Sequence, residues 1–246
     1  MQSSETLPDN TIWHLIHSSF LLKLNGMVMV FDYYLDPAKT SDRDDLRTGV
    51  IRPEVMAGEE VYVFASHGHQ DHFHPVVYDW RRQVTHIHYI LSYDIPSPPS
   101  QAVVFKPGER KSVGNLRVQS YSSTDAGLAY SIYTQDKHIY FSGDNAFWNW
   151  DGDLDDEIYE RHALSAIDRE TPMDIAFQVC DPRLNDMGDG GIHIFARNFQ
   201  PRLLVPIHAF GNYAFNVQVE NRLRERGYPN AYWCVGHRGE AFTIPQ

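Results

Sequence analysis

The chain has 246 residues, of which 42% are hydrophobic, so it is long enough to bury a sizeable core. Its formal net charge of −11 disfavours nucleic acid as a partner, because an acidic surface repels a polyanion. No apolar stretch approaches the about 20 residues that a membrane helix requires, which argues against a membrane protein.

The alternation of apolar and polar residues divides the chain into predicted strands and helices. Residues 1–10 are expected to form a tail, and residues 11–246 a single domain. Strands are predicted at 11–24, 27–31, 61–65, 85–92, 128–134, 138–141, 174–179 and 203–207, with hairpin-like strands within 103–120. Helices are predicted at 75–82, 153–169, 192–199 and 215–226. This order indicates an α/β (α+β) fold of two packed mixed sheets with helices outside.

The segment His67-Gly68-His69-Gln70-Asp71-His72 follows the predicted strand at 61–65 and carries three imidazoles and one carboxylate. In an extended chain His67 and His69 point to the same side, because side chains alternate with a period of two. A turn after them lets Asp71 and His72 face the same cavity. Such ligands suit Zn²⁺, and also Fe and Mn, so the segment predicts a metal site.

This segment resembles the H-x-H-x-D-H motif of the metallo-β-lactamase superfamily, and further segments agree with that family in order and spacing. They are Phe31-Asp32, Ser142-Gly143-Asp144 and Val205-Pro206-Ile207-His208. The early His17-Ser18-Ser19-Phe20 is typical of the branch related to ascorbate-6-phosphate lactonase, and the chain is similar to a bacterial subgroup of it. The resemblance implies a four-layer αββα sandwich.

The resemblance also implies roles for individual residues. The metal ligands that it implies are His67, His69, Asp71, His72, Asp144 and His208. Asp144 would bridge two ions, and Asp71 or Asp144 would orient the attacking water as the catalytic carboxylate. Asp32 would hold a ligand histidine in orientation without binding metal itself.

One departure from the family pattern concerns a further histidine, which the family places between the H-x-H-x-D-H segment and the Gly-Asp pair. This chain has no histidine from residue 89 to residue 137. Asp125 is the candidate substitute, as an oxygen ligand near His67 and His69. The site then holds either one ion or two ions with unequal affinities. A carboxylate in place of an imidazole also shifts the preference from Zn²⁺ toward Mn²⁺ or Fe²⁺.

Four residues outside the metal set are expected to line the substrate pocket: His17, Trp148, Arg183 and His193. Trp148 would supply an aromatic wall, and Arg183 would contact an anion. The two cysteines, Cys180 and Cys234, form no disulfide framework, and residues 1–10 lack a secretory signal. Both observations favour the cytoplasm, and both a monomer and an oligomer fit the sequence.

We expect a metal-dependent hydrolase that directs a metal-activated water at a small polar metabolite, such as a lactone, ester, amide or phosphoester. Its cofactor is one or two Zn²⁺ ions per chain, with Mn or Fe as the alternatives. Two other functions fit the same motifs. One is a phosphodiesterase or nuclease of the superfamily, and the other is a non-catalytic metal-binding protein that acts through a partner.

Overall fold

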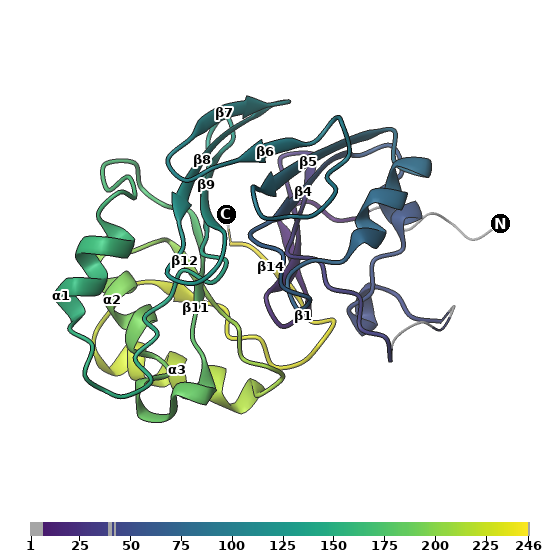
Figure 1. Cartoon of the computed structure of the whole chain (residues 1–246). Helices are drawn as coiled ribbons and strands as arrows, with labels where there is room; N and C mark the ends of the chain where they lie inside the picture. The colour runs from purple at the N-terminus through teal and green to yellow at the C-terminus, as the bar shows by residue number, and fades with distance from the viewer. Residues whose placement is uncertain (1–6, 39–40, 42, 246) are drawn as a thin grey trace.

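A computed structural model describes residues 7–38, 41 and 43–245 of the chain. Two sheets of seven strands face each other (Figure 1). In order across the first sheet, the strands are β14 (Ala241–Thr243), β1 (Thr11–Ile16), β2 (Ser19–Leu24), β3 (Met27–Phe31), β4 (Glu60–Ala65), β5 (His86–Ser92) and β6 (Val103–Phe105). Across the second they are β13 (Ala231–Tyr232), β12 (Leu203–Ile207), β11 (Ile175–Val179), β10 (His138–Phe141), β9 (Leu128–Tyr133), β8 (Leu116–Ser122) and β7 (Arg110–Val113).

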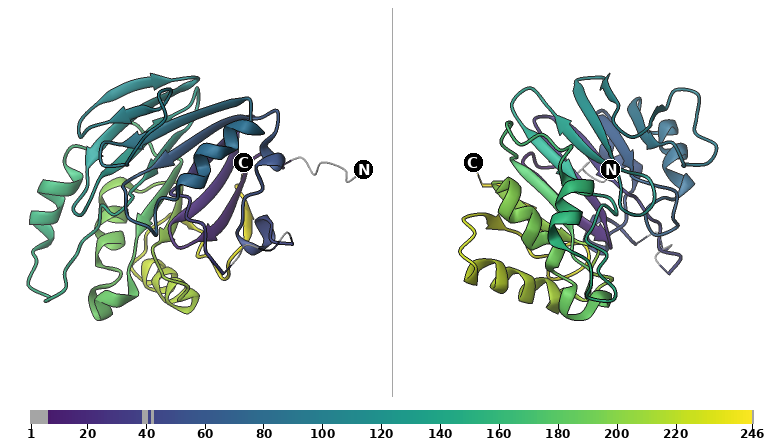
Figure 2. Two further views of the ribbon diagram at one scale, coloured as in Figure 1. Left: turned by 45° about the vertical axis from the view of Figure 1, so that its right-hand side comes forward. Right: turned by 60° about the vertical axis from the view of Figure 1, so that its left-hand side comes forward.

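Helices cover the outer face of each sheet (Figure 2). The second sheet packs against α1 (Asp156–Tyr159), which continues as the π-helical turn Glu160–Leu164, and against α2 (Gly190–Phe199) and α3 (Tyr213–Glu225). The first sheet packs against short 3₁₀ helices, of which the longest is Pro75–Arg82. Shorter 3₁₀ turns occupy Leu46–Thr48, Pro53–Met56 and Pro182–Met187. None of the helices that the structure describes is both long enough and apolar enough to cross a membrane.

Three apolar clusters fill the interfaces between these layers. The central one lies between the sheets, where Phe31 stacks on Phe64 and on Phe141 with ring planes 22° apart. The two outer clusters join each sheet to its helices. Four layers enclosing three cores are the αββα sandwich, so the predicted fold class is confirmed.

The parallel strands place chemically active residues at one edge of the sandwich. Strands β3, β4 and β5 are parallel, as are β10, β11 and β12. The carboxyl ends of parallel strands meet at one edge of a sheet, where open α/β sheets bind ligands. The residues that directly follow these ends include Asp32, Ser66, His67, Asp144, Asp181 and His208.

Two predicted elements differ in the structure. The predicted strand 11–24 is two strands, because His17 adopts a φ of 51° and turns the chain between β1 and β2. The predicted helix 153–169 is helical only over 156–164, since Asp155 caps it at a later residue. Of the predicted tail, residues 1–6 lie outside the described part of the chain.

Candidate metal centre

Asp32 is the buried anchor of the predicted metal centre. Its Oδ1 accepts the backbone N–H of Ser66 at 2.7 Å, and its Oδ2 accepts the Ser66 hydroxyl at 2.6 Å. Oδ2 also lies 2.7 Å from Nδ1 of His72. Both carboxylate oxygens are therefore occupied by donors, and the side chain is fully buried. This geometry matches the predicted role of orienting a histidine.

Asp144 gathers imidazoles from both sheets around its two oxygens. Its Oδ2 lies 3.4 Å from Nε2 of His67, and its Oδ1 lies 3.2 Å from Nε2 of His72 and 3.3 Å from Nε2 of His208. Nδ1 of His69 lies 3.0 Å from Nε2 of His67. The ligand atoms of His67, His69 and Asp144 all fall within 4.8 Å of one another, so these side chains form one potential site.

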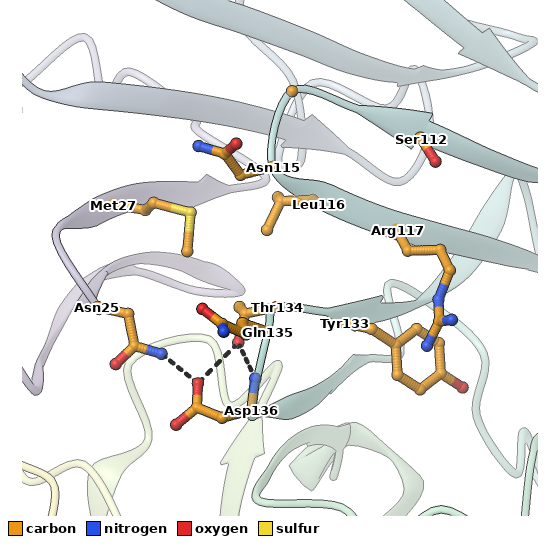
Figure 3. A pocket seen from close by; sticks show the side chains of 11 residues that line it. Asn25, Met27, Ser112, Asn115, Leu116, Arg117, Tyr133, Thr134, Gln135 and Asp136 are labelled. Carbon is orange, nitrogen blue, oxygen red and sulfur yellow. Dashed lines mark hydrogen bonds between the residues drawn. The ribbon is translucent and has the colours of Figure 1, made fainter.

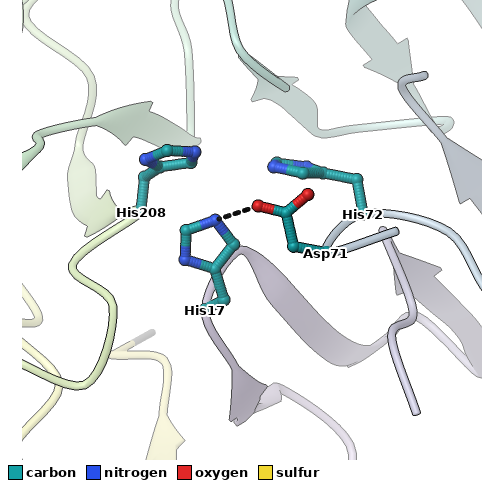
Figure 4. Close-up of side chains that lie close together, drawn as sticks. All are labelled: His17, Asp71, His72 and His208. Atoms are coloured by element: carbon teal, nitrogen blue, oxygen red, sulfur yellow. Dashed lines mark ion pairs between the residues drawn. The ribbon is translucent and has the colours of Figure 1, made fainter. Parts of the chain in front are cut away.

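A second group of ligand atoms adjoins the first. Its members are His17, Asp71, His72 and His208, whose ligand atoms also lie within 4.8 Å of one another (Figure 4). Asp71 reaches this group from the turn after His69, and its Oδ2 lies 3.5 Å from Nε2 of His17. Asp144 stands between the two groups through its contacts with His67 on one side and with His72 and His208 on the other.

Three of the buried imidazoles are oriented in the same way. Nδ1 of His67 contacts the Ser66 hydroxyl at 2.8 Å, Nδ1 of His72 contacts Asp32, and Nδ1 of His208 contacts Asp181 at 3.1 Å. Ser66 donates its own proton to Asp32, and the carboxylates of Asp32 and Asp181 only accept, so each Nδ1 is assigned as the N–H donor. Each Nε2 then faces Asp144, as outer hydrogen bonds arrange in metal sites.

The cluster suits a cation because it holds close polar atoms that do not bond to one another. Nε2 of His72 and Oδ1 of Asp144 are buried and have no hydrogen-bond partner among the described residues, although they are 3.2 Å apart. An unpaired buried polar atom costs about 1–3 kcal/mol. Atoms that point at a common centre, and so cannot bond in pairs, can all be satisfied by one cation. The residues present therefore fit the transition metal that the motif implies.

The metal-free cluster balances its charge with protons. Burial opposes the charged form of His72, but Asp144 and Asp32 outweigh it and raise the pKa of this imidazole to about 9. Burial also opposes the charged form of Asp144, yet His72 and His208 hold the pKa of this carboxyl well below its usual range. For His17, burial and the neighbouring His208 and His72 lower the pKa. A cation must therefore displace a proton from His72.

A cavity of about 500 Å³ opens over the cluster. Its floor includes His69, Asp71, Asp144 and His208. Its walls include Trp148 and Trp150, whose rings stack with centroids 6.1 Å apart, and Arg183. The Arg183 guanidinium lies 4.1 Å from the Phe210 ring centroid and 5.7 Å from that of Trp150. The cavity thus joins an aromatic wall and a cation to the ligand cluster.

Asp125 lines the same cavity but belongs to neither group of convergent ligand atoms. Its side chain is exposed, and its backbone N–H bonds the Ser123 hydroxyl at 3.2 Å. The loop is fixed by Thr124, whose hydroxyl donates to the carbonyl of Ala146 at 2.7 Å and accepts its N–H at 2.8 Å. The assignment of Asp125 as a metal ligand stays a prediction.

His193 does not line the cavity over the cluster. It lies on the buried face of α2, and its Nε2 is 3.0 Å from Asp189. It contributes to a separate cavity of about 240 Å³ between α2 and the segment that follows α3. The expectation that His193 contacts the substrate stays a prediction, and the cavity that His193 lines is not the one over the ligand cluster.

A larger hollow lies at the other end of the sandwich (Figure 3). It measures about 1070 Å³ and is lined by turns that precede β3, β8 and β10, whereas the metal cluster follows the strands. Asn25 donates to Asp136 at 2.6 Å across it, and Arg117 stacks on Tyr133 at 4.9 Å. None of the predicted metal ligands or pocket residues lines this hollow.

Asp181 is a residue of the site that the sequence did not single out. It is fully buried after β11, accepts from Nδ1 of His208, and pairs with the Arg183 guanidinium through both oxygens. Burial opposes its charged form, but His208 and Arg183 outweigh it and lower its pKa to about 2. Asp181 thus links a predicted ligand to the cavity wall. Its only local signal was an Asp-Pro pair that starts a helical turn.

Comparison with known proteins agrees with this geometry. Residues 11–208 match the beta-lactamase superfamily domain. No curated protein matches the chain. Among solved structures, Igni18, a metallo hydrolase from the archaeon Ignicoccus hospitalis, has a TM-score of 0.65 at 15% identity and covers 96% of this chain and 98% of its own. A possible metal-dependent hydrolase from Veillonella parvula has a TM-score of 0.62 at 10% identity, covering 96% and 99%.

CmlA, a diiron β-hydroxylase from Streptomyces venezuelae, is similar over 98% of this chain but only 55% of its own, with a TM-score of 0.59 at 11% identity. At such identities the similarity to solved structures concerns the fold. The domain match spans more than half of the chain. Together with the four-layer fold, this match shows that the chain belongs to the metallo-β-lactamase superfamily.

Proposed function

We propose that this protein is a metal-dependent hydrolase of a small polar metabolite. The observation that carries the proposal is the convergence of buried, unpaired ligand atoms of His72 and Asp144 at a cavity that Asp144 lines. A purely structural polar cluster would satisfy its own hydrogen bonds. Here the imidazoles are fixed from behind by Ser66, Asp32 and Asp181, and their free nitrogens face inward.

Two neighbouring ligand sets would hold the metal. His67, His69 and Asp144 supply one set, and Asp71, His72 and His208 supply the other, with Asp144 between them. When bound, one or two Zn²⁺ ions would lower the pKa of a coordinated water and polarise the oxygen of the scissile bond. Imidazole-rich sets favour Zn²⁺, whereas the carboxylates keep Mn²⁺ and Fe²⁺ as alternatives.

Asp71 and Asp144 would direct the attacking water in different ways. Asp71 is half-buried and lines the cavity, so its free oxygen can hold and accept a proton from a water above the cluster. Asp144 is almost fully buried and keeps its charge at all ordinary pH values, because the neighbouring imidazoles hold its pKa far below the usual range despite burial. Asp144 would therefore position the attacking water, and Asp71 would accept its proton.

The cavity walls favour a small substrate that carries a flat or apolar part and an anionic or strongly polar group. A volume of about 500 Å³ admits a metabolite, and the stacked Trp148 and Trp150 offer an apolar face. Arg183 remains partly exposed beside them. Lactones, esters, amides and phosphoesters fit this description, as does the lactonase-like branch. The acidic surface disfavours a nucleic acid, and we place the enzyme in the cytoplasm.

The test is hydrolysis by protein of known metal content. Metal is measured by elemental analysis, removed by chelation, and restored as Zn²⁺ or Mn²⁺. Each form is assayed on p-nitrophenyl acetate, p-nitrophenyl phosphate, bis-p-nitrophenyl phosphate and a simple γ-lactone. We expect turnover of at least one class by the loaded protein, lost on chelation.

Variants connect the turnover to the cluster. Asp71→Ala and His72→Ala should abolish hydrolysis with little loss of folding, whereas His86→Ala, which changes an exposed histidine on β5, should leave it unchanged. If the protein binds no metal on titration, or if hydrolysis persists after complete metal removal, the proposal is wrong.

A further inference from the structure

His17 occupies a backbone position that ordinarily favours another residue type. It lies in the two-residue turn between β1 and β2 with a φ of 51°. Such left-handed turn positions favour glycine and asparagine, because a Cβ there costs about 1–2 kcal/mol. The side chain is nevertheless 7% exposed, buried directly against the metal cluster. The turn therefore accepts backbone strain in order to place an imidazole inside the protein.

Both ring nitrogens of His17 are buried. Neither forms a hydrogen bond with a described residue, and the only ion-pair contact of the ring with those residues is that of Nε2 with Asp71 at 3.5 Å. This contrasts with His67, His72 and His208, each of which has its Nδ1 bonded to an oxygen. Leaving a buried polar atom unpaired costs about 1–3 kcal/mol. An apolar ring would pack in this position without that cost, so the presence of two buried nitrogens without hydrogen bonds requires another explanation.

The surroundings of His17 supply that explanation. Its ring centroid is 4.1 Å from that of His208 and 5.2 Å from that of His72, and its Nε2 faces Asp71. Figure 4 shows the four side chains directed toward a common centre, with His17 and His208 each on a segment of its own and Asp71 and His72 on a third.

We propose that His17 is a direct metal ligand, which completes a set of three imidazoles and one carboxylate with Asp71, His72 and His208. The inference rests on the proposed metal dependence and deepens it. Four protein ligands make a closed site of the kind that binds Zn²⁺ tightly. The opposite set, His67, His69 and Asp144, has only three ligands within the same distance of one another.

As a consequence, the two ions would have unequal numbers of protein ligands, and the side with more ligands would be the one beside His17. The family pattern would give the His67 and His69 side an additional histidine, and this chain has none between residues 89 and 137. The imidazole at residue 17 adds a ligand to the other side. The ion beside His17 then binds tightly and has few open positions, whereas the ion beside the exposed His69 keeps positions open to the cavity.

The experiment is a stepwise Co²⁺ titration of the metal-free full-length protein, followed by visible absorbance and by competition with a chelator of known affinity. His17→Asn removes the imidazole while keeping a residue that tolerates the left-handed turn. His17→Gly serves as a second variant, because glycine fits this φ without strain. His138→Asn is the matched control, since His138 is equally buried but has both nitrogens bonded, to Ser131 and Thr171.

We expect two unequal affinities in the natural protein. Both His17 variants should weaken the tighter one by more than the roughly 10–100-fold that loss of an outer hydrogen bond costs, and should change the spectrum of that ion alone. Their metal-free forms should unfold at urea concentrations no lower than the natural protein. His138→Asn should show the reverse, with lower stability and unchanged affinities.

Failure of the proposed function and failure of the His17 assignment give different results. If the natural protein binds no Co²⁺ or Zn²⁺, the proposed function fails together with this inference. If it binds metal and either folded His17 variant gives the natural affinities and spectrum, the proposed function stands and His17 is not a ligand. Lower stability with unchanged metal binding in the His17 variants would assign His17 to packing.

Discussion

Replacing Gly127 with alanine should push apart the loop and the strand end that build the metal centre. Gly127 has a φ of 69°, and a Cβ there would lie 2.1 Å from the carbonyl oxygen of Ser66 and 2.4 Å from Cβ of His67. Ordinary contacts of this kind begin at 3.4 Å. The added methyl group must therefore displace His67 or the loop by roughly 1 Å, a shift that can cost about 100-fold in a site that depends on orientation.

Gly108 provides a control that separates backbone strain from the steric clash. Its φ is 80°, and a Cβ there would meet no atom within 4 Å. Gly108→Ala should therefore cost only the left-handed penalty of about 1–2 kcal/mol. Gly127→Ala carries the same penalty and adds overpacking of about 1–3 kcal/mol. We expect it to lower the free energy of unfolding by about 2–5 kcal/mol in all.

Urea unfolding of the metal-free proteins measures the stability difference, and Zn²⁺ titration of the refolded proteins measures the effect on the site. Gly127→Ala should bind Zn²⁺ about 100-fold more weakly, whereas Gly108→Ala should bind it like the natural protein. Equal unfolding free energies for the two variants, with equal Zn²⁺ affinities, would show that the loop does not support His67.

Five further substitutions, at four positions, probe the surroundings of the cluster. Asp32→Asn should weaken Zn²⁺ binding about 10–100-fold in a titration, because His72 loses its charged acceptor. Asp181→Asn should weaken the ion held by His208 to a similar degree, and unchanged affinity would show that this bond does not orient the ring. Asp125→His should strengthen Zn²⁺ binding at the site beside His69, and Asp125→Ala should weaken it. Equal affinities in the natural protein and both variants would show that Asp125 is not a ligand. Burial lowers the pKa of His14 to about 4, so its contribution to stability is present above pH 6.5 and is lost as the pH falls through 4. This loss is about 3 kcal/mol in urea unfolding, and His14→Gln should lack it.

The sequence predicts the ligands that lie close together along the chain. His67, His69, Asp71 and His72 share one short segment after a buried strand, so their convergence needs only strand alternation and a turn. Asp144 and His208 each follow an apolar strand, but their assignment as ligands came from the family resemblance. The order of strands and helices predicts two packed mixed sheets with helices outside, and the resemblance implies the four-layer sandwich.

The remaining features of the site depend on tertiary structure. Asp181 reaches His208 because β11 and β12 pair in parallel with Val179 opposite Ile207, and a single sequence does not give that register.

The fold buries several charged residues at the carboxyl ends of its parallel strands. A bound metal ion would offset the free-energy cost of burying them. Asp32, Asp144 and Asp181 are all buried within hydrogen-bond distance of imidazoles, and each pairs with a histidine. Without metal, the balance depends on protons such as the one that the raised pKa of His72 retains up to about pH 9. A divalent ion would replace those protons and satisfy Nε2 of His72 and Oδ1 of Asp144, which are otherwise unpaired. Because the candidate ligands come from both sheets, an ion held by them would also connect the two halves of the sandwich. Metal binding would therefore raise the folding stability of this protein.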